Sequence, residues 1–113
     1  MRLTLSRIRA MQYKIMICFS SESPLQHIDF ARHIFSNRIQ DAGARLIDYL
    51  VTLDQGEAII TCEVPSWDKQ CPECAFNGIH SKHCSRAEQD PIQRTVQDVA
   101  GVELSIVDIC QTP

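Results

Sequence analysis

The residues best suited to chemistry in this sequence are cysteines and histidines gathered within one short segment. A C-x2-C pair, CPEC, spans residues 71–74, and the chain returns with His80, His83 and Cys84. Two thiolates two residues apart can bind one Zn2+ from a tight turn, and a loop of this length can bring further ligands to the opposite side of the ion. The spacing therefore predicts a tetrahedral zinc site.

The expected ligand set is Cys71, Cys74, His80 and Cys84, with His83 as the alternative fourth ligand. Adjacent side chains such as His83 and Cys84 seldom converge on one ion, because the backbone between them would have to distort. This favours His80 over His83. A turn expected at residues 77–78 would bring the two halves of the segment together.

These fourteen residues resemble the CCHC zinc knuckle, whose pattern is C-x2-C-x4-H-x4-C with a glycine where Gly78 stands. Here the spacing is C-x2-C-x5-H-x3-C, and Ile79 occupies the position of the family's histidine. The CPEC pair also resembles half of a zinc ribbon, but a second C-x2-C pair is absent from the sequence. Both resemblances imply a loop that holds zinc.

A redox pair is the alternative interpretation of Cys71 and Cys74, because their spacing resembles the C-x-x-C motif of thioredoxins. In that motif a helix N-terminus lowers the pKa of the first thiol, and no clear helix follows Cys71. An iron–sulfur cluster would need a fourth thiolate. Cys62 could supply it only by leaving an apolar strand face, where a small thiol is expected to pack in the core.

The elements that must position this segment are four strands and two helices. Apolar residues alternate in the expected strands, which cover residues 13–19, 47–53, 58–64 and 102–110. The helices are expected over 24–42 and from 91 to a stop at Gly101, because each begins with a Ser-Pro or Asp-Pro pair and ends before a glycine. Residues 54–57 form a turn-like linker that makes the middle strands a hairpin.

This element order predicts a single α+β domain over residues 1–113, a ferredoxin-like βαββαβ sandwich. In that architecture two helices cover one face of a four-stranded antiparallel sheet. Residues 65–90 form a metal-binding loop inserted between the third strand and the second helix. This loop has few large apolar residues to bury, so metal is expected to order it. Residues 1–10 are interpreted as a disordered or upstream extension, with Met11 as an alternative start.

Composition narrows the class of protein. The hydrophobic fraction of 44% is typical of a globular domain, and the formal net charge of −3 argues against non-specific binding to phosphate backbones. The apolar run 15–19 is too short for a secretory signal, and no stretch approaches the ~18 apolar residues of a membrane span. A cytoplasmic location, reduced cysteines and no membrane partner are expected.

The sequence also contains no glycine-rich phosphate loop, nucleophile elbow or H-E-x-x-H motif, so we expect no enzyme. The sheet face opposite the helices should instead be apolar, because one set of alternating strand residues points to it. These residues are Met16, Cys18, Leu46, Leu50, Ile59, Val107 and Ile109. Such a patch marks a protein partner or a homodimer interface, with Met16, Leu50, Ile59 and Val107 as the binding residues.

The leading hypothesis is therefore a non-enzymatic zinc-binding module that mediates macromolecular, chiefly protein–protein, interaction. A second hypothesis is single-stranded nucleic-acid binding through the zinc-knuckle-like loop, with Trp67 and Phe76 stacking on bases. The phosphates would then meet Lys69, Lys82 and Arg86. A third hypothesis is a thiol redox protein using Cys71 and Cys74, and a fourth is a small acidic inhibitor of a nucleic-acid-binding partner.

Overall fold

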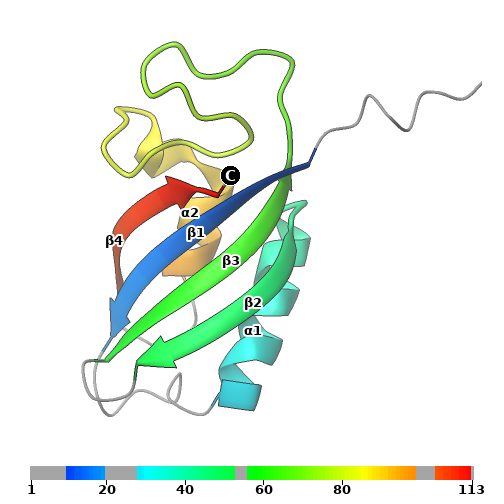
Figure 1. Ribbon diagram of the computed structural model, residues 1–113, viewed down its shortest axis with the longest axis vertical. Helices are drawn as coiled ribbons and strands as arrows, with labels where there is room; N and C mark the ends of the chain where they lie inside the picture. The colour runs from blue at the N-terminus through cyan, green and yellow to red at the C-terminus, as the bar shows by residue number, and fades with distance from the viewer. Residues whose placement is uncertain (1–9, 20–27, 53–55, 99–103, 113) are drawn as a thin grey trace, which may run out of the picture.

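The chain forms a small α+β domain with a four-stranded antiparallel sheet and two α-helices (Figure 1). The computed structural model describes residues 10–19, 28–52, 56–98 and 104–112. The elements, in chain order, are β1 (Ala10–Phe19), α1 (Ile28–Asp41), β2 (Arg45–Thr52), β3 (Glu57–Pro65), the 3-10 turn η4 (Ala87–Gln89), α2 (Pro91–Gln97) and β4 (Leu104–Gln111). Each expected strand and helix is present. The expected helix start at Ser23-Pro24, the linker 54–55 and the stop at Gly101 lie outside the described residues.

The sheet is open, with strand order β2-β3-β1-β4, and every neighbouring pair is antiparallel. The hairpin between β2 and β3 is confirmed. Both helices lie on the same face of this sheet, and the long loop after β3 rises beyond one end of it (Figure 1). Within the described residues, no helix is long and apolar enough to cross a membrane.

The core lies between the sheet and the helices, and strand alternation selects its residues. On β1 and β3 the expected core faces are confirmed, because every second side chain is buried. Burial of a large apolar side chain stabilises the fold by about 1.5 to 3 kcal/mol. The most deeply buried side chains include Tyr13, Ile15, Ile17, Phe35, Ile39, Tyr49, Ile60, Val64, Ile79 and Val96.

A β-bulge changes the side-chain pattern of β4. Ile17 pairs with Ile106 and Met16 pairs with Asp108, so Val107 is an extra residue in β4. A bulge of this kind reverses the alternation beyond it. Ile109 consequently faces the core and is only 3% exposed, so its expected place on the open face was wrong.

A second bulge does the same at the start of β2. Leu46 pairs with Cys62 and Asp48 pairs with Thr61, which leaves Ile47 as the extra residue. Leu46 therefore packs against the core, although we expected it on the open face. Ile47, which unbroken alternation would place on the core side together with Tyr49, is exposed. Both predictions assumed unbroken alternation.

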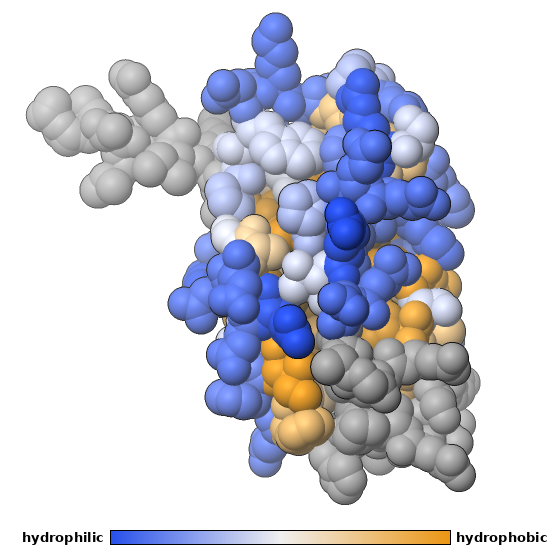
Figure 2. All heavy atoms as spheres, turned by 180° about the vertical axis from the view of Figure 1, so that it is seen from behind, coloured by the Kyte–Doolittle hydropathy of each residue, from blue (hydrophilic) through white to orange (hydrophobic). Residues whose placement is uncertain are grey.

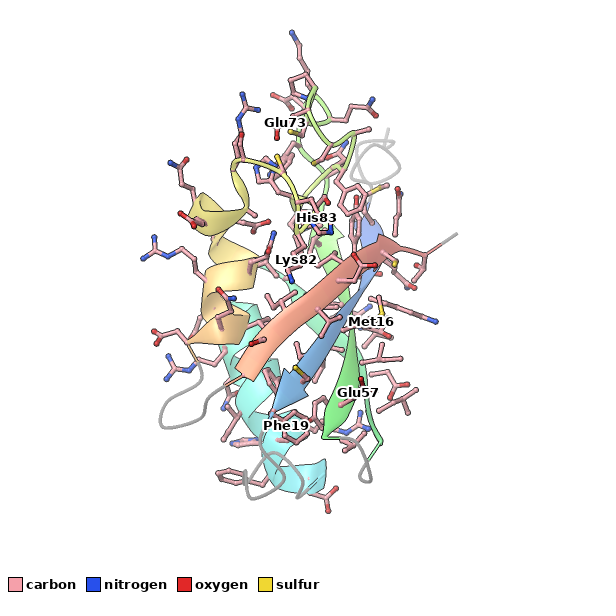
Figure 3. The ribbon with its side chains drawn as sticks, turned by 90° about the vertical axis from the view of Figure 1, so that its left-hand side faces the viewer. Met16, Phe19, Glu57, Glu73, Lys82 and His83 are labelled. Atoms are coloured by element: carbon pink, nitrogen blue, oxygen red, sulfur yellow. The ribbon has the colours of Figure 1, made fainter. Side chains whose placement is uncertain are left out.

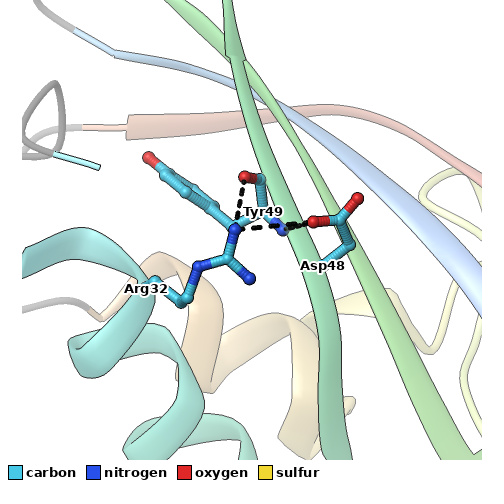
Figure 4. A network of polar contacts seen from close by, with 3 residues as sticks. All are labelled: Arg32, Asp48 and Tyr49. Carbon is cyan, nitrogen blue, oxygen red and sulfur yellow. Dashed lines mark hydrogen bonds and ion pairs between the residues drawn. The ribbon is translucent and has the colours of Figure 1, made fainter. Parts of the chain in front are cut away.

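Polar contacts also join α1 to the outer strand β2 (Figure 4). Arg32 Nη2 donates to the carbonyl oxygen of Tyr49 at 3.4 Å and lies 3.5 Å from Asp48 Oδ1. The same Oδ1 accepts the backbone N–H of Tyr49 at 2.9 Å. Because the Arg32 and Asp48 side chains are more than 40% exposed, the ion pair contributes little to stability.

The helix face of the molecule is mostly hydrophilic, with apolar atoms in separate patches (Figure 2). A groove of about 760 Å³ lies between α1 and α2. Its charged lining residues are Arg38, Asp41, Arg94 and Asp98, so it carries both signs and favours neither anions nor cations.

Candidate metal centre

The loop of residues 65–90 is held against the sheet by its middle part. Ile79 is fully buried in the core, and the ring of Phe76 packs 5.1 Å from that of Tyr13. The Tyr13 hydroxyl donates to the carbonyl oxygen of Asn77 at 3.0 Å and accepts the Asn77 backbone N–H at 2.9 Å. The loop therefore has an anchor of its own in the core, in addition to any order that a metal would provide.

Gly78 lets this part of the loop approach the sheet closely. Its φ is +89°, in the left-handed region that favours glycine. A Cβ at this position would lie 2.6 Å from Cγ2 of Val64 and 2.7 Å from the carbonyl oxygen of Pro65. The turn expected at residues 77–78 thus depends on a residue without a side chain.

Beyond this anchor, four ligand-type side chains converge. One donor atom from each of Cys71, Cys74, His80 and Cys84 lies within 4.8 Å of all the others. Cys71 Sγ lies 3.8 Å from Cys84 Sγ, which in turn lies 3.6 Å from His80 Nδ1. In tetrahedral zinc sites, bonds of about 2.3 Å to sulfur and 2.0 to 2.1 Å to nitrogen imply S···S edges of about 3.8 Å and S···N edges of about 3.6 Å. The cluster could therefore hold a metal ion.

The first two cysteines are brought together by a tight turn over residues 71–76. The Cys71 carbonyl oxygen accepts the N–H of Ala75 at 2.8 Å, and the Cys71 N–H donates to the carbonyl oxygen of Phe76 at 2.8 Å. Ala75 adopts φ +63°, a left-handed conformation that costs of order 1 kcal/mol for a residue other than glycine. The other contacts of the loop must offset this strain.

Hydrogen bonds hold the segment around Cys84 and connect it to the turn that carries Cys71 and Cys74. Cys84 N–H donates to the carbonyl oxygen of Ser81 at 3.1 Å. The carboxylate of Glu73 accepts both the N–H of Ser85 at 2.7 Å and its hydroxyl at 2.5 Å, which joins the two halves. Glu73 lies at the outer end of the loop, far from the sheet (Figure 3).

Hydrogen-bond donors also point at the sulfur atoms. The N–H of Ser81 donates to Cys74 Sγ at 3.4 Å, and Arg86 Nη1 donates to Cys71 Sγ at 3.6 Å. The hydrogen bond from the Cys74 backbone lowers the pKa of the Cys71 thiol to about 6, whereas burial raises the pKa of Cys84 to about 11. A bound metal ion would keep both sulfur atoms as thiolates.

The neighbouring candidates stand apart from this cluster. His83 is exposed, its backbone N–H donates to Ser81 Oγ at 3.2 Å, and it is not one of the four converging side chains. Cys62 is fully buried on β3, as expected, and burial raises the pKa of its thiol to about 12. It is thus part of the core and not a fourth thiolate. All six cysteines, each within the described ranges, are free.

The two aromatic residues considered for base stacking already pack on other rings. Phe76 is half-buried against Tyr13. Trp67 is 37% exposed, and its ring lies 4.8 Å from that of His80. Part of the Trp67 ring therefore remains accessible to solvent, whereas the Phe76 ring is used in packing the loop against the sheet.

Asp90 and Gln93 are functional candidates that neither ligand-type spacing nor a catalytic motif singles out. Asp90 is 1% exposed, and its Oδ1 accepts the N–H of Ile92 at 2.9 Å, as expected for the N-cap of α2. Its Oδ2 also accepts the N–H of His80 at 2.6 Å and Nε2 of Gln93 at 3.2 Å. The D-x-x-Q spacing of a capping box was the available signal.

No protein family, curated protein or solved structure matches this chain. The function must therefore be inferred from the chain's own side chains. Of these, the four converging ligands offer the most specific chemistry.

Proposed function

We propose that the chain is a zinc-stabilised module in which Cys71, Cys74, His80 and Cys84 bind one structural Zn2+. The single observation that supports this most strongly is the pair of edges at 3.8 Å and 3.6 Å, which match the tetrahedral geometry of zinc. Thiolate and imidazole ligands are those that zinc prefers. Four protein ligands would leave no open coordination position for a substrate, which favours a structural role.

The wider architecture in this proposal is a ferredoxin-like sandwich with the zinc loop inserted between β3 and α2. The element order and the strand order β2-β3-β1-β4 support it. The sandwich would fix one side of the loop through Ile79 and Tyr13, and the metal would fix the other. Because the ligands meet only in the folded loop, metal affinity would contribute to its stability.

Elemental analysis of protein purified under reducing, chelator-free conditions tests the zinc centre. We expect one zinc per chain, with loss of that zinc in Cys71→Ser and Cys84→Ser. Cys110→Ser is the matched control, because Cys110 is an exposed thiol outside the cluster. Wild-type protein without stoichiometric metal, or zinc retained in both cluster variants, would contradict the proposal.

We also propose that the open sheet face binds a protein, in the first instance a second copy of the chain. The supporting observation is an apolar row across the sheet, in which Leu50 pairs with Ile59 and Ile59 pairs with Met16. Leu50 is 57% exposed, and Val107, another of the expected binding residues, is 48% exposed. Such exposure of large apolar side chains is typical of an interface.

Charges beside this row are compatible with self-association. Met16 has Asp108 as its cross-strand neighbour, and Lys14 lies two residues away on the same strand face. A second copy of the chain would present the same acidic and basic side chains, so opposite charges could face each other across the interface. Light scattering of wild-type protein and Leu50→Lys tests this. A concentration-dependent dimer that Leu50→Lys disrupts is expected, and a wild-type monomer at every concentration would refute self-association.

A further inference from the structure

We propose that Asp90 and Gln93 are positioning residues that hold His80 in the orientation required for metal binding. This inference rests on the proposed zinc centre and goes beyond it, because it makes the start of α2 part of the metal site. Neither residue supplies a metal ligand. Both act through the backbone of a ligand.

Both peptide groups of His80 are held by these two side chains. The N–H of His80 donates to Asp90 Oδ2 at 2.6 Å, and its carbonyl oxygen accepts Gln93 Nε2 at 2.9 Å. Asp90 is 1% exposed and Gln93 is 4% exposed, so water competes little for either hydrogen bond. In such surroundings hydrogen bonds are stronger, and losing one partner is correspondingly costly.

The imidazole of His80 is restrained as well. Its ring lies 4.8 Å from that of Trp67, and its Nδ1 faces Cys84 Sγ at 3.6 Å. With the backbone held on both sides and the ring packed, His80 loses little further freedom when it binds an ion. Preorganisation of this kind raises affinity because the ordering cost is met during folding.

The Asp90 carboxylate links this ligand to α2. One oxygen caps the helix through the N–H of Ile92, and the other holds His80. Because α2 has only seven residues, it depends on its cap and on packing for its stability. Metal binding and the order of the first turn of α2 should therefore support each other.

Two variants separate positioning from capping. Gln93→Ala removes the donor to the His80 carbonyl oxygen and leaves the Asp90 cap intact. Asp90→Asn keeps one acceptor oxygen, which suffices for an N-cap, but cannot accept from Ile92, His80 and Gln93 as the carboxylate does. Gln97→Ala is the control, because Gln97 is exposed on the same helix.

The measurements are zinc affinity by chelator competition and the visible absorption spectrum of the Co2+-substituted protein. We expect about 10- to 100-fold weaker zinc binding in Gln93→Ala and Asp90→Asn, as for other supporting residues of metal sites. Their Co2+ spectra should differ from wild type, which a purely structural destabilisation of the domain would not produce. Gln97→Ala should match wild type in both.

The outcomes distinguish the two proposals. If wild-type protein binds neither Zn2+ nor Co2+, the zinc centre itself is refuted. If wild type binds metal and Gln93→Ala binds it with unchanged affinity and an unchanged Co2+ spectrum, the positioning role alone is refuted. Should circular dichroism show that Asp90→Asn is unfolded, Gln93→Ala decides the question.

Discussion

Ile79 offers a sharp test of how the metal loop is held, because the zinc-knuckle pattern places a histidine ligand at this position. In the structure Ile79 instead lies fully buried in the core, next to Gly78 and one residue before His80. The perturbation is Ile79→Ala, which removes buried methyl and methylene groups and leaves every ligand-type side chain in place.

The expected cost follows from that burial. Replacing a fully buried isoleucine by alanine costs about 2 to 5 kcal/mol, since it loses transfer free energy and leaves a cavity. A domain of this size has a total stability of about 5 to 15 kcal/mol. Ile79→Ala should therefore remove a large fraction of the free energy of unfolding and should weaken zinc binding, because His80 follows the anchor directly.

Urea denaturation followed by circular dichroism measures this cost. Ile47→Ala is the matched control, because the same side chain is removed at the exposed bulge of β2, where about 1 kcal/mol or less is expected. Similar free energies of unfolding for Ile79→Ala and wild type would refute the anchoring role. A larger loss for Ile47→Ala than for Ile79→Ala would refute the assignment of the two environments.

Three further predictions concern close packing, titration and metal removal. Gly78→Ala should lower the melting temperature more than Gly43→Ala, because both glycines have positive φ but only Gly78 has atoms that an added Cβ would strike. Because burial raises the pKa of Cys62 from 9.0 to about 12, the folded state favours the neutral thiol. The stability that the neutral Cys62 thiol contributes is fully present below pH 9 and is lost as the pH rises towards 12. The free energy of unfolding of Cys62→Ala should therefore decline less steeply at alkaline pH than that of wild type. An equally steep decline in both proteins would contradict the raised pKa of Cys62. Chelation of the bound metal should increase hydrogen exchange in residues 71–85 more than in β1 and β3, and equal protection with and without metal would contradict a structural role.

Much of the secondary structure and the candidate ligand set can be predicted from local sequence patterns. Alternation along β1 and β3 predicts their buried faces, because a pleated strand places every second side chain on the same side. The Asp-Pro pair predicts the start of α2 for an equally local reason, since an Asp side chain can cap the N–H groups of the first turn. The C-x2-C spacing likewise predicts that Cys71 and Cys74 lie together.

Other features depended on contacts between distant segments. The bulges that turn Ile109 and Leu46 inward arise from pairing with β1 and β3, and one extra residue reverses every side chain beyond it. Spacing within the loop already favoured His80 over His83, but it did not predict the contacts that surround His80. Its backbone N–H donates to Asp90 at the start of α2, and the preceding residue, Ile79, is buried in the core. The sequence by itself determined the elements and the kinds of ligand, because these depend on neighbouring residues. Only the tertiary structure decided where the strands bulge and how the loop is held, because that requires the sheet, α2 and the loop to pack together.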